Sequence, residues 1–503
     1  MERDVRPALA ALILLCVLLP AAPMARASEP AAFEPATWQR EIESSKLDPA
    51  RAVTLKGVEL KAGLATLVLE EGILVPASPV AGRSAEMVFL GKGKILLTPP
   101  DDIEKGQLEL FTGSTRLEEP FTEMVLALGL DGAVDALLRK AKAAPDTAQT
   151  QRAAELYTRW RARPERKLLD VEGAILADAS GDSAAQGFVA AWLKGGELGD
   201  FLYVVDPGAN EQVTLGSFVP LDATEKEKRK ILKQIDRQQR QGRLIGVELE
   251  DLGQWNTWLS ASLRGKENKV VAGLDGFEPQ KYTLDVSLDN DLKMTGKARL
   301  DLLPTIQGAH VADLTLYSDL TVNKVTDAAG ADLFFHRVGG GLRVFLPKTP
   351  GPQETVTLNV EYQGAAIHKD GNTYLLRDTE GWYPHAGTVD RAPYDVTLRW
   401  PRKVDLVAPG KRVDGGEDSG RLWERRTFEI PTSWFTFEVG RYKIETAQAG
   451  HVKVNLAFDP EAKQLLKKER EEIRQTVVDS LAYFEDLFGP YPLDEITVVT
   501  TPR

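Results

Sequence analysis

The sequence predicts a multi-domain, β-rich protein with an N-terminal α+β region, an all-β sandwich and then the incomplete start of an α/β domain. Its 503 residues are enough for about three domains at roughly 150 residues each. Apolar and polar residues alternate most regularly between residues 277 and 450, which is the period of half-buried strands. Between residues 459 and 489 the apolar residues instead follow the spacing of one helix face.

The composition is ordinary for a globular protein, with 43% hydrophobic and 27% charged residues. The net charge of −12 argues against nucleic acid or an anionic membrane surface as a general partner. Cys16 is the only cysteine, and it lies close to the N-terminus. If that segment is removed, the mature chain has no disulfide and no thiolate metal site.

The first 27 residues have the pattern of a signal peptide. Arg3 and Arg6 precede an apolar run at 8–19, and Ala25 and Ala27 place small residues where a signal peptidase cleaves. A transmembrane anchor is the alternative, but the run is shorter than the roughly 20 residues that span a bilayer. The pattern therefore predicts cleavage after Ala27, export to the periplasm or the medium, and no membrane span in the mature chain.

Residues 28–131 predict a β-rich N-terminal region, and residues 132–276 predict an α+β region. Within the second, helices are expected near 134–142 and 149–162. The highly charged stretch at 222–243 predicts a solvated helix that joins two domains. A site for an anionic partner is the alternative interpretation of that stretch.

Residues 277–450 predict an all-β sandwich of about eight strands or more. Apolar residues alternate at 282–288, a DND turn reverses the chain, and the alternation resumes from Met294. The pattern predicts a hairpin at the start of the sandwich. The glycine triplet at 339–341 indicates a turn rather than a phosphate loop, because no helix with a Lys-Ser/Thr pair follows it.

Residues 451–503 predict the start of an α/β domain. An alternating strand leads to Asp459, an expected N-cap with Pro460 at the first helical position. The helix is expected to end at Gly489, before an apolar strand at 496–500. Five apolar residues fall at the spacing of one helix face: Ile473, Val477, Leu481, Phe484 and Phe488. One helix and two strands are too few for a domain, so we expect an incomplete unit.

The residues alone predict no catalytic constellation and no metal site. The five histidines include no pair at the spacing of a helical zinc site, and no HExxH motif occurs. His310 and His336 lie in the β-rich region, where a lone histidine is expected to be a surface or half-buried residue rather than a ligand. His385 follows Trp382 and Tyr383 in an aromatic turn and is the histidine most expected to have a structural partner.

Four stretches resemble, in the right order, the alanyl aminopeptidase (gluzincin) family of zinc metallopeptidases. They are YTLDVSLDNDLKMTGKARLDLLP, GWYPHAGTVDRAPYDVTLRWPRKVDLVAPGK, RRTFEIPTSWFTFEVGRYKIE and SLAYFEDLFGPYPLDEITVVTTPR. The first three are similar to the family's saddle-like, non-catalytic β-domain. The fourth is similar to the first helix, the FGPYP turn and the first strand of its thermolysin-like domain. The resemblance runs from Gln280 onward, less than half of the 503 residues.

The resemblance implies peptide hydrolysis, with a zinc ion that polarises the scissile carbonyl and activates water in intact family members. The family's GxMEN-type strand and HExxH helix do not occur in these 503 residues. We therefore expect an N-terminal part that has no zinc site, is inactive alone, and has peptides and a missing C-terminal catalytic portion as partners. Glu380 is the only counterpart of a family residue that binds the peptide's amino terminus; an exposed turn carboxylate is the alternative.

Two other interpretations stay open on the sequence. A non-catalytic exported binding or scaffold protein would use residues 28–276 and the sandwich, and would be expected to have a self-contained C-terminus. A separate downstream polypeptide would instead complete the catalytic domain in trans. Residues 28–276 resemble the extra N-terminal region of some exported bacterial family members, on the phrases LTPPDDIEKGQLELFTG and GDFLYVVDPGANEQVTLGSF, and no function follows from that.

Overall fold

The structure, a computed structural model, is β-rich and built from several sheets. It describes residues 34–129, 133–144, 148–209, 212–218, 255–263, 276–370, 373–379, 381–387, 391–459 and 467–500. The signal peptide predicted at 1–27 and the charged helix predicted at 222–243 lie outside these residues. In the part of the chain that is described, no helix is both long and apolar enough to cross a membrane.

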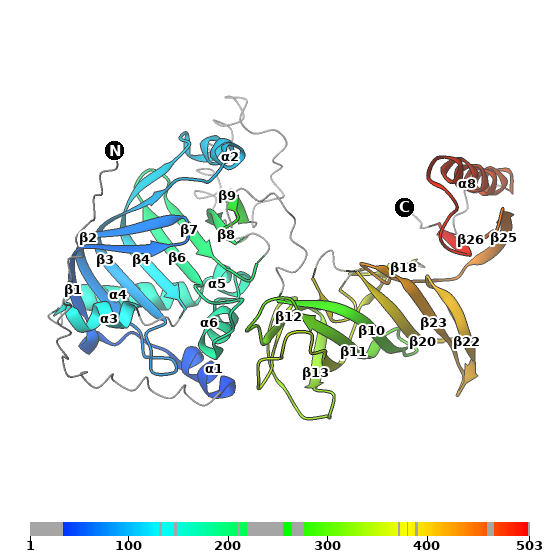
Figure 1. Cartoon of the computed structure of the whole chain (residues 1–503), viewed down its shortest axis with the longest axis horizontal. Helices are drawn as coiled ribbons and strands as arrows, with labels where there is room; N and C mark the ends of the chain where they lie inside the picture. The colour runs from blue at the N-terminus through cyan, green and yellow to red at the C-terminus, as the bar shows by residue number, and fades with distance from the viewer. Residues whose placement is uncertain are drawn as a thin grey trace, which may run out of the picture. The chain divides into compact units, whose positions relative to one another are not determined.

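The N-terminal sheet has nine antiparallel strands in the order β5-β1-β2-β3-β4-β6-β7-β8-β9 (blue to green in Figure 1). They are β1 (Val53–Ala62), β2 (Ala65–Pro76), β3 (Glu86–Leu97), β4 (Leu117–Leu128), β5 (Lys142–Ala143), β6 (Val189–Gly195), β7 (Asp200–Val205), β8 (Val213–Phe218) and β9 (Trp255–Ala261). Because β4 pairs with β6, one sheet joins strands from both sides of residue 131. The domain boundaries expected from the sequence stay predictions.

The nine-stranded sheet is curved, so that strands far apart in its order meet. The Tyr203 hydroxyl on β7 donates a hydrogen bond to the carbonyl oxygen of Ala62, 2.6 Å away, in the β1–β2 turn. It accepts bonds from the backbone N–H groups of Leu64 and Ala65, both at 3.1 Å. Gly63, at the tip of that turn, has a φ of +56°, which glycine adopts without strain. The enclosed face carries one apolar core drawn from most of these strands.

The helices of this region precede the first strand or lie between strands in the chain. They are α1 (Pro35–Ser44), the short 3-10 helix η1 (Pro49–Arg51), α2 (Asp102–Thr112), α3 (Ala133–Lys140), α4 (Ala148–Arg161), α5 (Pro164–Leu168) and α6 (Val171–Ser180). The two helices expected near 134–142 and 149–162 are confirmed as α3 and α4. Helix α6 begins where the Asp170 side chain accepts a bond from the N–H of Gly173, and it ends at Gly181, whose φ is +82°.

The middle of the chain forms a seven-stranded sheet, β13-β16-β11-β10-β20-β23-β22, and a four-stranded sheet, β14-β15-β12-β19. The strands are β10 (Phe277–Leu288), β11 (Met294–Pro304), β12 (Val311–Thr315), β13 (Leu320–Thr326), β14 (Phe334–Val338), β15 (Gly341–Phe345), β16 (Val356–Gly364), β19 (His385–Ala386), β20 (Ala392–Pro401), β22 (Lys411–Asp418) and β23 (Arg421–Thr432). Both sheets contribute to one apolar core. The hairpin expected at 282–294 is confirmed, since β10 pairs with β11 up to Leu288 and Met294.

Two short strand pairs complete this part: β17 (Ile367–Asp370) with β18 (Thr373–Leu376), and β21 (Asp405–Val407) with β24 (Glu438–Gly440). The last sheet has three strands, β25 (Lys443–Ala449), β26 (Val452–Phe458) and β27 (Glu495–Val499), and β26 and β27 are parallel. Helix α8 (Lys467–Phe488) connects them and lies beside this sheet in Figure 1. Gly489 follows α8 with a φ of +90°, which confirms the predicted end of the helix.

The apolar stripe of α8 divides into a packed part and an exposed part. Ile473, Val477 and Leu481 pack on the small sheet. Phe484 and Phe488, however, are 54% and 82% exposed. The physical reason is that a three-stranded sheet covers only the first part of the stripe. The cap expected at Asp459 and Pro460 lies at the edge of the described residues, and α8 is described from Lys467 onward.

Candidate functional site

The aromatic turn singled out in the sequence is part of the core. Trp382 and Tyr383 are fully buried, and His385 is 3% exposed. The indole N–H of Trp382 donates to the carbonyl oxygen of Phe435 at 2.9 Å, and Nε2 of His385 lies 2.9 Å from the carbonyl oxygen of Ser433. The structural partner expected for His385 is therefore confirmed, and all three side chains act in the packing of the fold.

Two tyrosines beside this turn keep their protons at neutral pH. Burial raises the pKa of Tyr383 well above its ordinary range, and burial also raises the pKa of Tyr394 to about 12. Their hydroxyl oxygens are 2.9 Å apart, and the Tyr394 hydroxyl also donates to the carbonyl oxygen of Ser433. A general acid or base needs a pKa near the working pH, so these phenols serve as hydrogen-bonding groups.

Glu380, the one residue predicted to bind substrate, lies outside the described residues. Both backbone polar groups of its neighbour Gly381 are hydrogen-bonded. The N–H of Gly381 donates to Oδ1 of Asp378 at 2.7 Å, and its carbonyl oxygen accepts from the N–H of Tyr317 at 2.7 Å. The backbone next to Glu380 is therefore well anchored. The substrate-binding role of Glu380 stays a prediction.

The expectation for His310 and His336 is wrong in its burial. They are only 7% and 4% exposed, and both are hydrogen-bonded across long distances in the sequence. His310 reaches the carbonyl oxygen of Ser180, and Nε2 of His336 lies 2.8 Å from Oδ1 of Asp170. Nothing in the local sequence distinguishes these histidines from surface residues. Their partners are Ser180, the last residue of helix α6, and Asp170, the residue immediately before that helix.

A row of three polar side chains crosses the four-stranded sheet next to α6. His336 on β14 is opposite Arg343 on β15, and Arg343 is in turn opposite Asp313 on β12. Nε of Arg343 donates to Oδ1 of Asp313 at 2.8 Å, while Nη1 lies 3.2 Å from Oδ2 of Asp170. Nη2 lies 4.0 Å from a carboxylate oxygen of Asp206. The guanidinium of Arg343 therefore forms ion pairs with three carboxylates.

The pKa values of the two buried carboxylates in this cluster, Asp170 and Asp206, shift in opposite directions. Burial acts to raise the pKa of Asp170, but the hydrogen bond from His336 and the charge of Arg343 outweigh it and lower that pKa. Burial raises the pKa of Asp206, which the more distant Arg343 does not offset. Burial acts to lower the pKa of Arg343, yet the nearby carboxylates raise it, Asp313 most strongly. The arrangement holds Arg343 and Asp170 as a charged pair.

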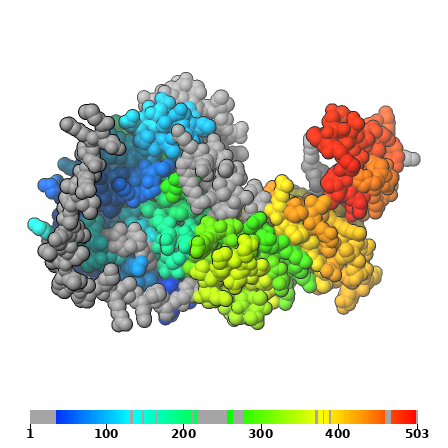
Figure 2. Space-filling model, in the orientation of Figure 1, coloured from blue at the N-terminus to red at the C-terminus, as the bar shows by residue number. Residues whose placement is uncertain are grey.

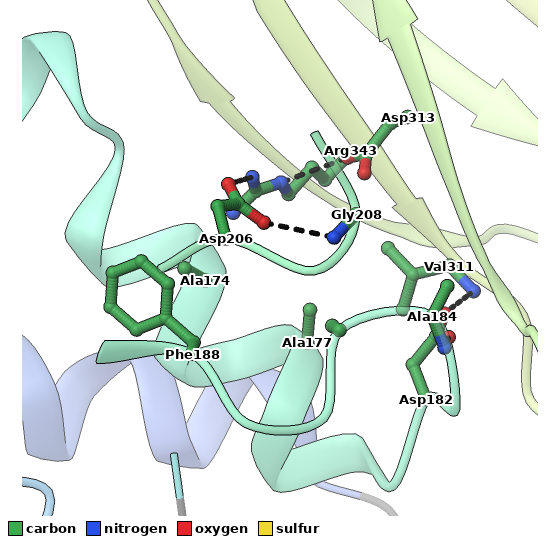
Figure 3. A pocket seen from close by; sticks show the side chains of 11 residues that line it. Ala174, Ala177, Asp182, Ala184, Phe188, Asp206, Gly208, Val311, Asp313 and Arg343 are labelled. Atoms are coloured by element: carbon green, nitrogen blue, oxygen red, sulfur yellow. Dashed lines mark hydrogen bonds and ion pairs between the residues drawn. The ribbon is translucent and has the colours of Figure 1, made fainter. Parts of the chain in front are cut away.

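A small pocket lies within this cluster (Figure 3). In that view Asp206 and Arg343 face each other, with Asp313 behind Arg343 and the side chains of Ala174 and Phe188 nearby. The free volume is about 10 Å³, which is the room needed by a single water molecule. The pocket thus fits a bridging water rather than an organic substrate.

The described residues do not fit a zinc site. No group of three or more histidine, cysteine, aspartate and glutamate side chains is placed to hold a metal ion in the described ranges. Across all 503 residues there is also no HExxH motif. No step of a zinc mechanism is therefore assigned to the described residues.

An apolar patch lies on the C-terminal part of α8. It consists of Tyr483, Phe484, Leu487 and Phe488, which are between 54% and 82% exposed. The rings of Phe484 and Phe488 lie 6.2 Å apart and are stacked. Figure 2 shows this C-terminal part, drawn in orange and red, at the molecular surface. Contiguous exposed aromatic groups of this kind are typical of a surface that another protein segment covers.

Comparison with known proteins gives limited similarity. No protein-family model matches the chain, and no curated protein matches it. Among solved structures, it is similar to an M1 zinc metallopeptidase from Deinococcus radiodurans, with 19% identity, a TM-score of 0.38, and coverage of 44% of this chain and 56% of that one. A mutant of that enzyme bound to a Tyr-Ser-Ala substrate gives 20% identity, a TM-score of 0.37, and coverage of 45% and 57%.

The chain thus spans a little more than half the length of these structures. At these values the similarity assigns neither a family nor an activity to this protein.

Proposed function

We propose that this chain is the N-terminal, non-catalytic part of an exported zinc metallo-aminopeptidase-like protein, and that it meets peptides only together with a catalytic portion. The observation that carries the proposal is the uncovered apolar patch of α8, Tyr483, Phe484, Leu487 and Phe488. The earlier part of the same helix packs on β25–β27 through Ile473, Val477 and Leu481. A helix whose apolar residues extend beyond the sheet that it packs on is suited to burial by a further layer.

The neighbouring strand β27 supports the same proposal. In the described residues it pairs with β26 on one side only, and all five of its residues are half-buried. An open strand edge beside an apolar helix face can accept a further strand and a further packing layer. The FGPYP-type resemblance at 488–492 would place the rest of a thermolysin-like domain there. In this proposal the seven- and four-stranded sheets act as a scaffold and Glu380 contacts the peptide's amino terminus.

The proposal is tested by comparing the 503-residue chain with a chain continued through the downstream reading frame. The short chain is expected to bind a hydrophobic dye, to associate with rising concentration, and to show neither stoichiometric zinc nor hydrolysis of aminoacyl amides. The continued chain is expected to lose dye binding and to gain both zinc and hydrolysis. Downstream DNA without a GxMEN…HExxH continuation in any frame would refute the proposal, as would tightly held zinc in the short chain.

A non-catalytic exported binding or scaffold protein is the second candidate. It is favoured by the nine-stranded sheet, which has its own apolar core in residues that lie outside the aminopeptidase resemblance. This candidate predicts that the 503-residue chain is monomeric at high concentration and binds no hydrophobic dye. Sedimentation velocity and dye fluorescence on one purified sample separate the two candidates.

Export is part of the proposal and has its own test. The charged start, the apolar run at 8–19 and the small residues at Ala25 and Ala27 support it. Expression in a bacterium followed by N-terminal sequencing is expected to give a mature chain that begins at Ser28. An uncleaved chain recovered with the membrane fraction would instead favour the anchor.

A further inference from the structure

The two edge strands of the seven-stranded sheet differ in what lies beside them. At one edge, the segment that follows β13 returns to it: the N–H of Leu333 donates to the carbonyl oxygen of Val325 at 2.9 Å, and Thr326 forms a bridge with Asp332. At the other edge, β22 pairs only with β23 in the described ranges. Figure 1 shows β22 as the last strand of this sheet, beyond β23. The β22 edge can therefore accept a further strand.

Strand β22 is also exposed on both of its faces. Every residue of the strand except Gly415 is exposed, and Val413 is 48% exposed. Its neighbour β23 differs, because Leu422 and Phe428 on that strand pack against the core of the sandwich. Strand β22 thus gains little burial from its own chain, although it completes the sheet.

The charges of β22 are segregated by sign along the strand. Its sequence is KRVDGGED, so it begins with Lys411 and Arg412 and ends with Glu417 and Asp418. Charged side chains on an edge strand usually discourage pairing with another chain. With this order of charges, however, a second copy of β22 in antiparallel orientation brings each terminal basic residue opposite an acidic one. A parallel copy would instead place like charges side by side.

The faces of the strand agree with one antiparallel register. The pairing with β23 places Arg412 and Glu417 on one face of the sheet and Lys411 and Asp418 on the other. A two-fold axis through Gly415 sets Lys411 opposite Asp418 of a second copy, and Arg412 opposite Glu417 of that copy. Directly opposed residues of an antiparallel pair share a face, so both charge pairs meet on matching faces.

The centre of the strand fits the same register. Val413 is the extra residue of a β-bulge in the pairing with β23, between Arg412 and Asp414. If the bulge is kept, Asp414 lies opposite Gly416 of the second copy and Gly415 lies opposite its own equivalent. No two charges of the same sign are then directly opposed, and the two glycines leave the centre free of bulky side chains.

The terminal charges are available for contacts with a second copy. Lys411 and Asp418 form no ion pair with the part of the chain that the structure describes. Nε of Arg412 lies 3.4 Å from Oε1 of Glu424, and its side chain is still exposed. Glu417 pairs with an arginine of its own chain and is likewise exposed. None of these four side chains has to leave a buried site in order to reach across the strand edge.

We propose that β22 is a dimerisation edge, through which two copies of this chain pair in antiparallel register and join their seven-stranded sheets. Association stops at two copies, because the β13 edge of each sheet is occupied by residues 332–333 and a two-fold interface is closed. The interface is a single pair of eight-residue strands, so the dimer is weak and sensitive to salt. The dimer is independent of the proposed function and of the apolar patch on α8.

The first test is sedimentation velocity on the 503-residue chain carrying Phe484→Ser and Phe488→Ser, called the background chain. These changes remove most of the apolar patch on α8, which is a separate route to association. Between about 1 μM and about 100 μM, the background chain is expected to pass from monomer to dimer and grow no further. Salt at about 0.5 M is expected to weaken the dimer about tenfold. A background chain that stays monomeric, or that grows beyond two copies, would overturn the proposal.

Reversal of the charges gives a sharper test in the background chain. The acidic variant carries Lys411→Glu and Arg412→Glu, and the basic variant carries Glu417→Lys and Asp418→Lys. Each variant alone is expected to be monomeric, since like charges are then opposed at both ends. An equal mixture is expected to form a one-to-one heterodimer, because all four opposed pairs regain opposite signs. A variant that did not fold could not give this result, and a mixture without heterodimers would refute the register.

A matched control separates the strand edge from net charge. Lys297→Glu with Lys348→Glu changes the net charge as much as the acidic variant does, at two exposed side chains outside β22. This control is expected to dimerise as the background chain does, and loss of its dimer would contradict an interface at β22. Amide exchange at 411–418 should slow with concentration in the control but not in the acidic variant.

The outcome can be distinguished from that of the proposed function. In the unaltered chain, the β22 dimer adds to any association through α8, and dye fluorescence is the measurement there that reports the α8 patch alone. A background chain without dimers would leave dye binding, zinc content and hydrolysis as they are expected above. Loss of dye binding without loss of the dimer would count against the α8 proposal only.

Discussion

The aromatic side chains around Trp382 and those at the end of α8 are alike in chemistry and opposite in environment. Trp382 and Tyr383 are fully buried, whereas Tyr483 and Phe488 are 62% and 82% exposed. Ring contacts occur in both regions, since Trp382 and Tyr383 have centroids 4.8 Å apart and Phe484 and Phe488 have centroids 6.2 Å apart. Contact between aromatic rings therefore does not show that they belong to a core. A core also requires a second layer of structure that shields the rings from solvent.

The largest expected effect lies in the enclosed region. Trp382→Ala removes a fully buried indole and its 2.9 Å bond to Phe435, and should lower the free energy of unfolding by about 3–5 kcal/mol. Trp434→Ala is the control, because Trp434 is 44% exposed and should change stability by less than about 0.5 kcal/mol. Denaturant unfolding followed by tryptophan fluorescence measures both. Equal losses would break the comparison.

A second pair divides α8 itself into a packed and an uncovered face. Leu481 is 7% exposed and packs on the small sheet, so Leu481→Ala should cost about 2–5 kcal/mol and speed amide exchange in β25 and β26. Phe488→Ala should leave that exchange unchanged and reduce dye binding, because its ring is 82% exposed. Faster exchange in Phe488→Ala would show that the exposed ring already stabilises the unit.

A third pair tests two buried hydroxyls. Tyr203→Phe removes a group that makes three hydrogen bonds to the β1–β2 turn, and should cost about 1–3 kcal/mol. The Tyr362 hydroxyl is fully buried and has no hydrogen-bond partner among the described residues, so Tyr362→Phe should be neutral or slightly stabilising. Thermal unfolding of both variants gives the comparison. Destabilisation in Tyr362→Phe would point to a bridging water at that hydroxyl.

The smallest expected effects come from the two carboxylates beside Arg343. Asp170 has a lowered pKa, so its ionised form stabilises the fold above the pKa it has when unfolded, and this is lost as pH falls through the folded value. Asp206 has a raised pKa, so its contribution is present at low pH and lost as pH rises through its folded value.

At pH 7, Asp170→Asn should therefore destabilise by about 1–2 kcal/mol, while Asp206→Asn should stabilise by about 1 kcal/mol. Urea unfolding at several pH values measures both. The stabilising effect of Asp206→Asn should fade below about pH 4, where the carboxyl group of the wild-type residue is itself protonated. The same sign for the two variants would contradict the assigned ion pair.

Local patterns in the sequence predict local structure well here. Alternation at 282–288 predicts the β10–β11 hairpin, and Gly489 predicts the end of α8, because both depend on neighbours in the chain. Helical spacing on α8 shows that Phe484 and Phe488 share a face with Leu481, but it does not show what covers that face. Burial of that face depends on how far the neighbouring sheet extends, and other segments of the chain form that sheet.

The α6 contacts could not be predicted from the sequence. Asp170 and His336 are 166 residues apart, and Asp182 and Val311 are 129 apart. A single aspartate or histidine has no periodic pattern, and its burial follows only from the way distant strands pair. Asp170 is three residues before Gly173, which is the spacing of an N-cap and its bonded N–H. That spacing is consistent with the start of a helix, but it does not indicate the contacts of Asp170 with His336 and Arg343.

The Tyr203 hydrogen bonds can form only late in the synthesis of the N-terminal sheet. Tyr203 and Ala62 are 141 residues apart, so synthesis of the intervening chain takes on the order of ten seconds at roughly 5–20 residues per second. Within that interval β4 is complete once Leu128 is made, and its outer edge has no partner until β6, which begins at Val189, is made. A newly made chain is therefore most exposed to association through β4 before β6 has left the ribosome.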